Sequence, residues 1–269
     1  MFFEKNVINK NPIKVDIRFA LAYPNIYRTA MSSLGYQILY NLINDREDSY
    51  AERIIYPSVR SLETNSPLKD FDIISFSLQY EQDYFNVLEL LHSAQIPLKR
   101  EDRGDNDPLI IAGGPCASSN PLPLSDYVDI FIVGEGEVVL NNFLNLYSEL
   151  NDSNLSIKSN LDKFANLDGV YVSKLDNEVQ MAILDDMVGA YPVYYPIITE
   201  TDDDELLPVF SNSILLNVSR GCTRGCRFCM SSYLYRPLRE TNASELLNIA
   251  KTAREKTGLN KVSLIGAAV

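Results

Sequence analysis

The stretch 220-RGCTRGCRFCMSSYLYRPLRE-240 contains three of the four cysteines of this 269-residue chain. Its cysteines, Cys222, Cys226 and Cys229, have the spacing C-x3-C-x2-C. The apolar run SILLNVS (213–219) before them predicts a β-strand, so the cysteines lie on a loop that leaves a strand. Three thiols this close together on one loop indicate a site for a metal or a metal cluster.

Three thiolates can bind three irons of a cubane iron–sulfur cluster and leave the fourth iron open, whereas structural zinc normally takes four protein ligands. A fourth zinc ligand would have to be Cys116, His92 or a carboxylate, and all of these are distant in the sequence. The spacing therefore favours a cluster with one open iron. Cys116 itself is expected to be a small buried side chain rather than a ligand or redox thiol, and His92 a structural side chain.

Beyond the loop, the sequence predicts a helix over 244–257, ended by Gly258, and a strand over 261–266. The loop itself is positively charged, because residues 220–239 include five arginines and no acidic residue. Two of these, Arg236 and Arg239, are candidates either to bind a carboxylate or to pair with nearby acidic residues.

The composition of the whole chain narrows the class of protein. With 46% hydrophobic residues and no apolar run near the ~18 that span a bilayer, the sequence predicts a globular protein without a membrane segment. It has 24 Lys and Arg against 36 Asp and Glu, a net charge of −12, which argues against general binding to nucleic acid. The N-terminal residues do not look secretory and the cysteines make a poor disulfide framework, so a cytoplasmic location is expected.

The N-terminal half alternates apolar strands with amphipathic helices. Strands are predicted over 15–22, 71–78, 108–115 and 127–134, and helices over 32–43, 81–94 and 137–150. This alternation indicates an α/β fold with a parallel, Rossmann-like or flavodoxin-like sheet. We expect three segments: a Rossmann-like domain over 1–150, a connecting segment with a β-hairpin (169–174 and 178–183) over 151–210, and a third segment over 211–269.

In such a sheet, ligands lie beyond the carboxyl ends of the strands. Here those ends are followed by residues 23–25, 113–116 and 134–137. Small residues there let backbone N–H groups approach a ligand such as a phosphate, although the same residues also serve tight turns. The glycines concerned are Gly113, Gly114, Gly134 and Gly136.

Together with Phe228, the three loop cysteines resemble the C-x3-C-x-aromatic-C signature of the radical S-adenosylmethionine (radical SAM) superfamily. The resemblance implies that the cysteines hold a [4Fe-4S] cluster, whose open iron binds S-adenosylmethionine for reductive cleavage to a 5′-deoxyadenosyl radical. It places Phe228 near the adenine. It places Gly266 and Ala267 near the methionine moiety, where the superfamily often has a Gly-Gly-Glu-like stretch. The segment 211–269 would then begin a (β/α)6 barrel.

Four other stretches narrow the resemblance: IAGGPC (111–116), VDIFIVGEGE (128–137), GVYVSK (169–174) and YRPLRE (235–240). They look like an uncharacterised radical SAM family in the subgroup with an N-terminal cobalamin-binding-type domain. The glycines of 113–114 and 134–136 would line its cobalamin crevice. The D-x-H-x-x-G motif that supplies a histidine ligand is absent, so cobalamin would bind without histidine or not at all.

The resemblance implies a radical SAM enzyme that modifies an unidentified small-molecule or macromolecular substrate, with methyl transfer as one reaction of the subgroup. An electron donor such as a flavodoxin or ferredoxin is the implied partner. Two strands and one helix are only the start of a barrel, so the chain is expected to be either a fragment of a longer enzyme or a truncated product. The alternatives are a non-catalytic iron–sulfur fragment that acts as an electron carrier or sensor and, less favoured, a zinc-binding module. The sequence identifies no catalytic residue.

Overall fold

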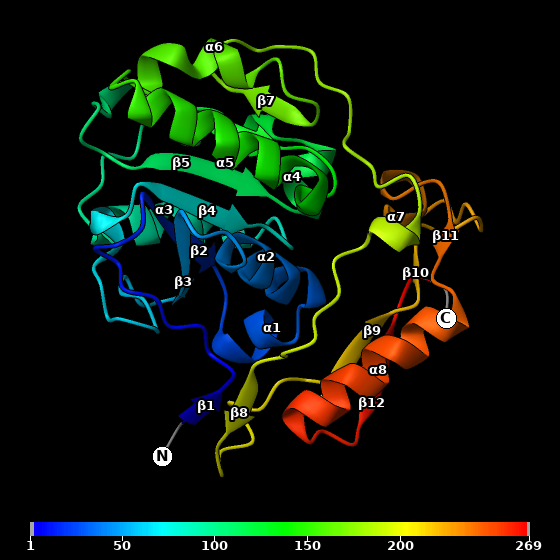
Figure 1. Cartoon of the computed structure of the whole chain (residues 1–269). Helices are drawn as coiled ribbons and strands as arrows, with labels where there is room; N and C mark the ends of the chain where they lie inside the picture. Colours follow the sequence, from blue (N-terminus) through cyan, green and yellow to red (C-terminus); the bar gives the residue numbers. More distant parts are fainter. Residues whose placement is uncertain (1–2, 268–269) are drawn as a thin grey trace. The chain divides into compact units, whose positions relative to one another are not determined.

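The structure is a computed structural model that describes residues 3–267 (Figure 1). The chain divides into two compact units. The sheet unit comprises Ile8–Ile26 and Leu42–Ala182, and the cysteine unit comprises Met1–Val7, Tyr27–Asn41 and Ile183–Val269. The chain therefore passes between the units four times, and none of these passages coincides with the boundaries after residues 150 and 210 that the sequence suggests.

A six-stranded sheet with the order β3-β2-β4-β5-β6-β7 forms the centre of the sheet unit. Neighbouring strands are parallel, except that β7 is antiparallel to β6. This confirms the predicted α/β class, and the first five strands have the flavodoxin-like order 2-1-3-4-5. The strands are β2 (Ile17–Tyr23), β3 (Ser49–Ile55), β4 (Ile73–Ser77), β5 (Leu109–Gly113), β6 (Ile130–Ile132) and β7 (Val170–Val172).

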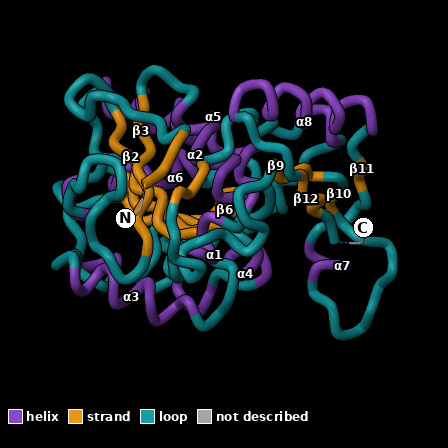
Figure 2. The backbone as a smooth tube through the Cα atoms, turned by 90° about the horizontal axis from the view of Figure 1, so that it is seen from below, coloured by secondary structure: helices purple, strands orange, loops and turns teal. Residues whose placement is uncertain are grey.

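Helices cover both faces of this sheet. Figure 2 shows α3 (Asp83–Ser93) and α4 (Pro115–Ser119) on one face and α5 (Gly136–Asp152) on the other. Leu90 of α3 and Ala117 of α4 belong to one buried cluster with strand side chains. Residues 3–190 also contain α1 (Tyr27–Met31), α2 (Leu34–Asn44), α6 (Leu161–Phe164) and the 3-10 turns η1 (Leu68–Asp70), η2 (Arg100–Asp102), η3 (Leu122–Leu124), η4 (Lys158–Asn160) and η5 (Met187–Gly189).

The central strands are apolar because a parallel strand between two helical layers is covered on both faces. Every residue of β2 except Arg18 is buried. The edge strand β3 is also buried along its whole length, although it contains Glu52 and Arg53. Those two charges break the apolar pattern, which is why the sequence did not predict this strand.

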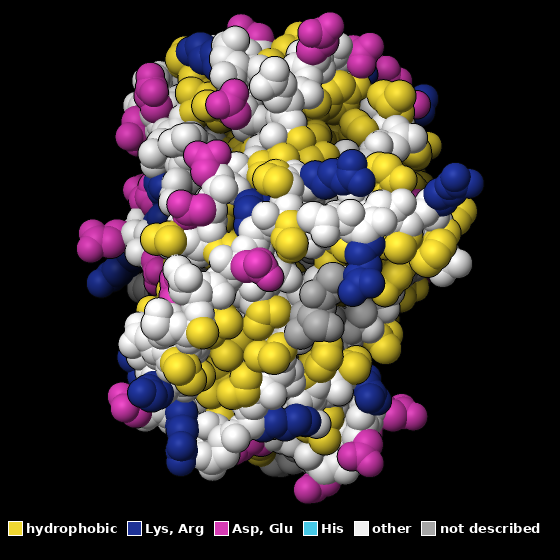
Figure 3. Space-filling view, turned by 90° about the vertical axis from the view of Figure 1, so that its right-hand side faces the viewer, with side chains coloured by type: hydrophobic (Ala, Val, Ile, Leu, Met, Phe, Trp, Pro, Cys, Tyr) yellow, Lys and Arg dark blue, Asp and Glu magenta, His cyan; other side chains and the backbone are white. Residues whose placement is uncertain are grey.

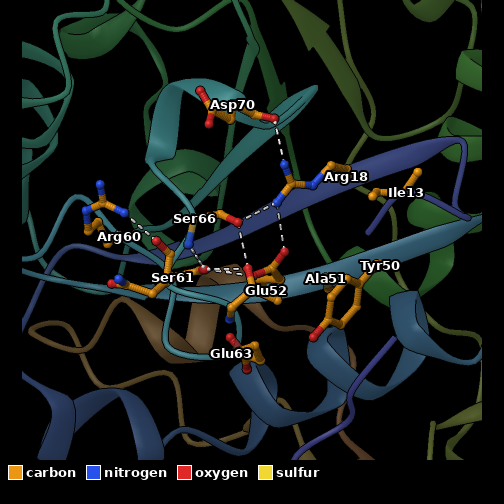
Figure 4. A network of polar contacts seen from close by, with 12 residues as sticks. Ile13, Arg18, Tyr50, Ala51, Glu52, Arg60, Ser61, Glu63, Ser66 and Asp70 are labelled. Atoms are coloured by element: carbon orange, nitrogen blue, oxygen red, sulfur yellow. Dashed lines mark hydrogen bonds and ion pairs between the residues drawn. The ribbon is translucent and has the colours of Figure 1, made fainter. Parts of the chain in front are cut away.

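The charges of β3 are paired by the loop 58–67 that follows it. Arg53 Nε donates to Glu63 Oε1 at 2.6 Å, and Arg53 N donates to Glu63 Oε2 at 2.7 Å. Ser61 Oγ and Arg18 Nη2 donate to the two carboxylate oxygens of Glu52, at 2.6 Å and 3.0 Å (Figure 4). The loop thus covers a sheet edge that would otherwise present unpaired backbone groups.

The hairpin expected over 169–183 is not formed in the described residues. The strand β7 pairs with β6, and Ala182 makes a single parallel bridge with Gly134. The side chain of Asn177 replaces a second strand, since its Oδ1 accepts from Val172 N at 2.8 Å and its Nδ2 donates to Val170 O at 3.0 Å.

A β-α-β arrangement forms the core of the cysteine unit. The strands β9 (Ile214–Asn217) and β12 (Val262–Ile265) are parallel neighbours, and α8 (Ala243–Thr257) connects them. Ala253 of α8 packs with Ile214 and Leu216 of β9. This confirms the predicted order of strand, loop, helix and strand, and Gly258 ends α8 with φ of 76°.

Two further features complete the cysteine unit. The strand β1 (Phe3–Lys5) pairs antiparallel with β8 (Ile198–Glu200), and α7 (Ser231–Leu234) lies within the cysteine loop. Over residues 3–267, no helix combines the length and the apolar character that crossing a membrane requires.

Candidate functional site

The cysteine loop, residues 221–238, is closed at its base by a short two-stranded ladder. The strand β10 (Ser219–Arg220) pairs antiparallel with β11 (Arg239–Glu240), as Figure 1 shows beside α7. Thr241 fastens the ladder to the core, because its Oγ1 donates to Asn217 O at 2.7 Å and its N donates to Val218 O at 3.0 Å. The three cysteines therefore lie on a loop whose two ends are held together.

Gly221 makes the close approach of the loop ends possible. Its φ is +80°, and a Cβ at this position would lie 2.4 Å from the carbonyl oxygens of Tyr235 and Pro237. No side chain fits against backbone at that distance, and positive φ also favours glycine. Close packing therefore explains why the residue directly before Cys222 is a glycine. The sequence shows only that a glycine stands there, not the contacts that require it.

All three loop cysteines are free thiols. Cys222 is buried, Cys226 and Cys229 are partly exposed, and Cys229 N donates to Cys226 O at 3.0 Å. Gly225, with φ of +60°, provides the turn between the first two cysteines. The donor set thus consists of three soft ligands on one closed loop, which suits an iron–sulfur cluster.

The sulfur atoms are not gathered into a ligand set in this conformation, since no group of three His, Cys, Asp or Glu side chains in residues 3–267 could hold a metal ion. Sites of this kind acquire their geometry as the metal binds, because binding and local folding are coupled. The three cysteines therefore fit a cluster by the chemistry of their sulfur atoms and not by the positions of those atoms in this structure.

The tip of the loop exposes large apolar side chains. Phe228 is 92% exposed, and Met230 and Tyr233 are 47% and 56% exposed. Figure 3 looks from the side on which α7 and β12 lie in Figure 1, and it shows hydrophobic side chains in patches with Lys and Arg beside them. Exposed apolar surface of this kind is typical of a binding region.

Gly266 and Ala267 follow β12 and are exposed. Since β12 and β9 are parallel and Ile265 pairs with Asn217, these residues lie at the same sheet edge from which the cysteine loop departs. Contacts of Phe228, Gly266 and Ala267 with S-adenosylmethionine stay a prediction. Ala268, which follows them in the same stretch, is outside the described residues.

The two arginines after the cysteines differ in their surroundings. Arg239 is 7% exposed and donates to three backbone carbonyls, those of Pro237 at 3.1 Å, Leu184 at 2.7 Å and Tyr235 at 3.3 Å. Arg236 is exposed and stacks on Tyr233, with its guanidinium carbon 4.9 Å from the ring centroid. Arg239 therefore holds the base of the loop, whereas Arg236 is placed where a ligand can reach it.

The glycines at the carboxyl ends of β5 and β6 approach the chain's own backbone. A Cβ on Gly114 would lie 2.6 Å from Leu78 O, and one on Gly134 would lie 2.1 Å from Ala182 O. At Gly113 a Cβ would make only ordinary contacts, the nearest at 3.6 Å. Packing thus accounts for Gly114 and Gly134, while a cobalamin crevice along Gly113, Gly114, Gly134 and Gly136 stays a prediction.

Cys116 and His92 have the structural surroundings expected of them. Cys116 is 1% exposed, and burial raises the pKa of its thiol to about 11. His92 lies in the last turn of α3 with an exposed side chain.

Asp83, the first residue of α3, is a buried acidic residue that was not predicted from the sequence. Its side chain is buried, and its Oδ1 accepts from Asn25 Nδ2 at 2.7 Å. The sequence does contain one feature that points to this position, because the polar stretch 79-QYEQD-83 directly follows the predicted strand 71–78. Polar residues at the carboxyl end of a parallel strand are candidates for a ligand site.

Two comparisons with known proteins place the chain among relatives. Residues 35–173 match the family described as radical SAM proteins, N-terminal. The chain is also 30% identical over 261 residues to the uncharacterized protein MJ0966 of Methanocaldococcus jannaschii. This alignment covers 96% of this chain and 50% of that protein. The chain thus spans about half the length of this curated relative.

Proposed function

The chain belongs to the family of radical SAM proteins that is defined by their N-terminal region, and from this premise we propose that Cys222, Cys226 and Cys229 bind a [4Fe-4S] cluster for the reductive cleavage of S-adenosylmethionine. The observation that carries the proposal is the closed loop with three free thiols. Held by Cys222, Cys226 and Cys229, such a cluster would supply the one electron needed to break a carbon–sulfur bond of S-adenosylmethionine, giving methionine and a 5′-deoxyadenosyl radical that would act on the substrate.

The chain's own residues would position this chemistry. The β10–β11 ladder and Gly221 hold the ends of the loop together, so a smaller part of the loop must order when the metal binds. Burial of Cys222 shields one thiolate from water. The exposed ring of Phe228 offers an apolar surface for the adenine, and the backbone of Gly266 and Ala267 is available to the methionine moiety.

The domain assignment follows the same reasoning. The flavodoxin-like order of the sheet unit supports a cobalamin-binding-type domain by architecture, and the parallel β9–β12 pair with α8 supports the start of a radical SAM barrel. The residues do not fit a histidine-ligated cobalamin, because His92 lies at the end of α3 and the backbones of Leu78 and Ala182 fill the space beside Gly114 and Gly134. The proposed reaction therefore gives no role to a histidine-ligated cobalamin.

A second candidate is an iron–sulfur protein that carries or senses electrons without cleaving S-adenosylmethionine. One observation favours it: at the edge after β12, Gly266 and Ala267 present no charged side chain to hold the methionine moiety. In either case a flavodoxin or ferredoxin would be a suitable electron donor.

The decisive experiment is anaerobic reconstitution of the chain with iron and sulfide, followed by an assay for 5′-deoxyadenosine under strong reductant. The proposal predicts a cluster and product in the wild-type chain and neither in Cys226→Ala. Cys116→Ala is the matched control, because it removes the fourth cysteine from a buried site outside the loop. A cluster without product would favour the electron carrier, and zinc without iron would overturn both candidates.

A further inference from the structure

The sheet unit has a second polar site, at the point where the order of its strands reverses. From β2 the chain goes first to β3 on one side and then to β4 on the other side. In sheets of this type, a crevice opens beyond the carboxyl ends of the strands at that reversal, and ligands bind there. Two segments of the sheet unit meet at this point, residues 24–26 after β2 and residues 78–82 after β4.

A buried carboxylate joins these two segments. Asp83 is 2% exposed, and its Oδ1 accepts a hydrogen bond from Asn25 Nδ2 at 2.7 Å. In the described part of the chain, its Oδ2 has no hydrogen-bond partner. A buried carboxylate oxygen without a donor is costly, so the arrangement is complete only when a donor arrives.

The charges around Asp83 select the kind of donor. Residues 23–26 and 77–83 contain no lysine or arginine, and Glu81 adds a second carboxylate. Burial raises the pKa of Asp83, and the hydroxyl of the buried Tyr23 lies close enough for Asp83 to help raise the pKa of that tyrosine. With two carboxylates and no cationic side chain in these two segments, a positively charged group is favoured over a phosphate group.

Aromatic surface is also present. Tyr80, which belongs to the segment after β4, is 59% exposed, and a tyrosine ring attracts an organic cation through its electron-rich face. A carboxylate beside Tyr23, with Tyr80 exposed on the neighbouring segment, suits an alkylammonium group, which can donate N–H to Oδ2 and present its carbon atoms to an aromatic ring.

We infer that Tyr23, Asn25, Tyr80 and Asp83 form a binding site for a cationic amine, with Asp83 Oδ2 as the acceptor. The site is made entirely by the sheet unit and does not involve the three loop cysteines. Its existence therefore does not depend on the proposed cluster chemistry.

The test uses butylammonium as the probe, with butanol as the neutral analogue and inorganic phosphate as the anion. Binding to the intact chain is followed by calorimetry and by the NMR signals of the Asn25 side-chain amide. The expected result is saturable binding of butylammonium that shifts the Asn25 signals, with no binding of butanol or phosphate. Equal binding of butanol, binding of phosphate, or no saturable binding of butylammonium would each overturn the inference.

A variant tests the role of the carboxylate. Asp83→Asn keeps the size of the side chain and removes its charge, so affinity for butylammonium should fall at least about tenfold. Asp102→Asn, at an exposed position, is the control and should bind as the wild type does. Unchanged affinity in Asp83→Asn would contradict the assignment. If that variant does not fold, the comparison of the three probes on the wild-type chain still decides.

Discussion

Two loops of this protein, 58–67 in the sheet unit and 221–238 in the cysteine unit, each follow a strand and are held at their bases. They differ in whether their charged, thiol and apolar side chains are buried within the fold or exposed. The first buries the Glu63 carboxylate against a partner from the same unit, and Glu63 Oε1 lies 2.6 Å from Arg53 Nε. The second exposes Phe228 and has three free thiols. The first loop is stabilised by contacts within the fold, whereas the second presents the groups through which the proposed cluster and its cosubstrate would bind.

Breaking the ion pair of the first loop should have the largest effect on stability. Glu63→Ala would remove the carboxylate that is paired with the buried Arg53 guanidinium, and breaking a buried ion pair typically costs about 3–5 kcal/mol. Urea unfolding monitored by circular dichroism measures the loss. Glu101→Ala is the control, since its pair with Lys99 is exposed and should contribute at most about 1 kcal/mol. Similar losses in the two variants would mean that the loop 58–67 does not depend on its buried charges.

The thiols of the two units should differ strongly in reactivity. Because the pKa of Cys116 is raised to about 11 from 9.0, its thiolate fraction near pH 8 should be roughly 100-fold below that of an ordinary thiol. Alkylation by iodoacetamide, mapped by mass spectrometry, should modify the loop cysteines first. The rate at Cys116 should rise as pH approaches 11. Modification of Cys116 as fast as Cys226 at pH 8 would show that its surroundings are not those of a buried side chain.

Gly221→Ala tests whether the base of the cysteine loop is fixed by close packing. The new Cβ would meet two carbonyl oxygens at positive φ, and strain of this kind costs about 1–3 kcal/mol. Iron binding in reconstitution should fall while the sheet unit keeps its unfolding midpoint. Gly258→Ala is a close match, because its φ is +76° and nothing lies within 4 Å of the added carbon. Equal iron binding in Gly221→Ala and the wild type would contradict this role.

The smallest change in stability is expected for Phe228→Ala. The ring is 92% exposed, so its removal should alter the free energy of unfolding by less than about 0.5 kcal/mol. Affinity for S-adenosylmethionine in the reconstituted chain should fall nonetheless, and equilibrium dialysis measures it. Tyr195→Ala, another exposed aromatic outside the loop, should leave that affinity unchanged. A loss of stability without a loss of affinity would assign Phe228 a packing role instead.

The sequence predicted the parts of the fold whose pattern is local. The strands β2, β4, β5 and β6 are apolar runs, and their burial on both faces gives them a signal that needs no knowledge of their neighbours. The strand β3 was not predicted, because Glu52 and Arg53 are acceptable in a buried strand only when the loop 58–67 supplies their partners. That pairing depends on tertiary structure and produces no periodic pattern in the sequence.

Prediction of the candidate site was uneven for the same reason. Spacing and the family signature together single out Cys222, Cys226 and Cys229, so the sequence alone predicts them as cluster ligands, and that role stays a prediction. The position of Gly221 against Tyr235 and Pro237, and the use of Arg239 for backbone carbonyls, depend on contacts between segments that the sequence does not reveal. Asp83 was not predicted because the sequence does not distinguish a buried aspartate from an exposed one at the start of a helix.

The pairing of β1 with β8 has a consequence for biosynthesis. Lys5 and Glu200, whose side chains meet at this ladder, are 195 residues apart in the chain. At a translation rate of roughly 5–20 residues per second, the ribosome would need roughly 10–40 s to produce the second strand after the first. Throughout that interval Phe3–Lys5 has no strand partner, while the sheet unit between the two strands can already be synthesised and fold.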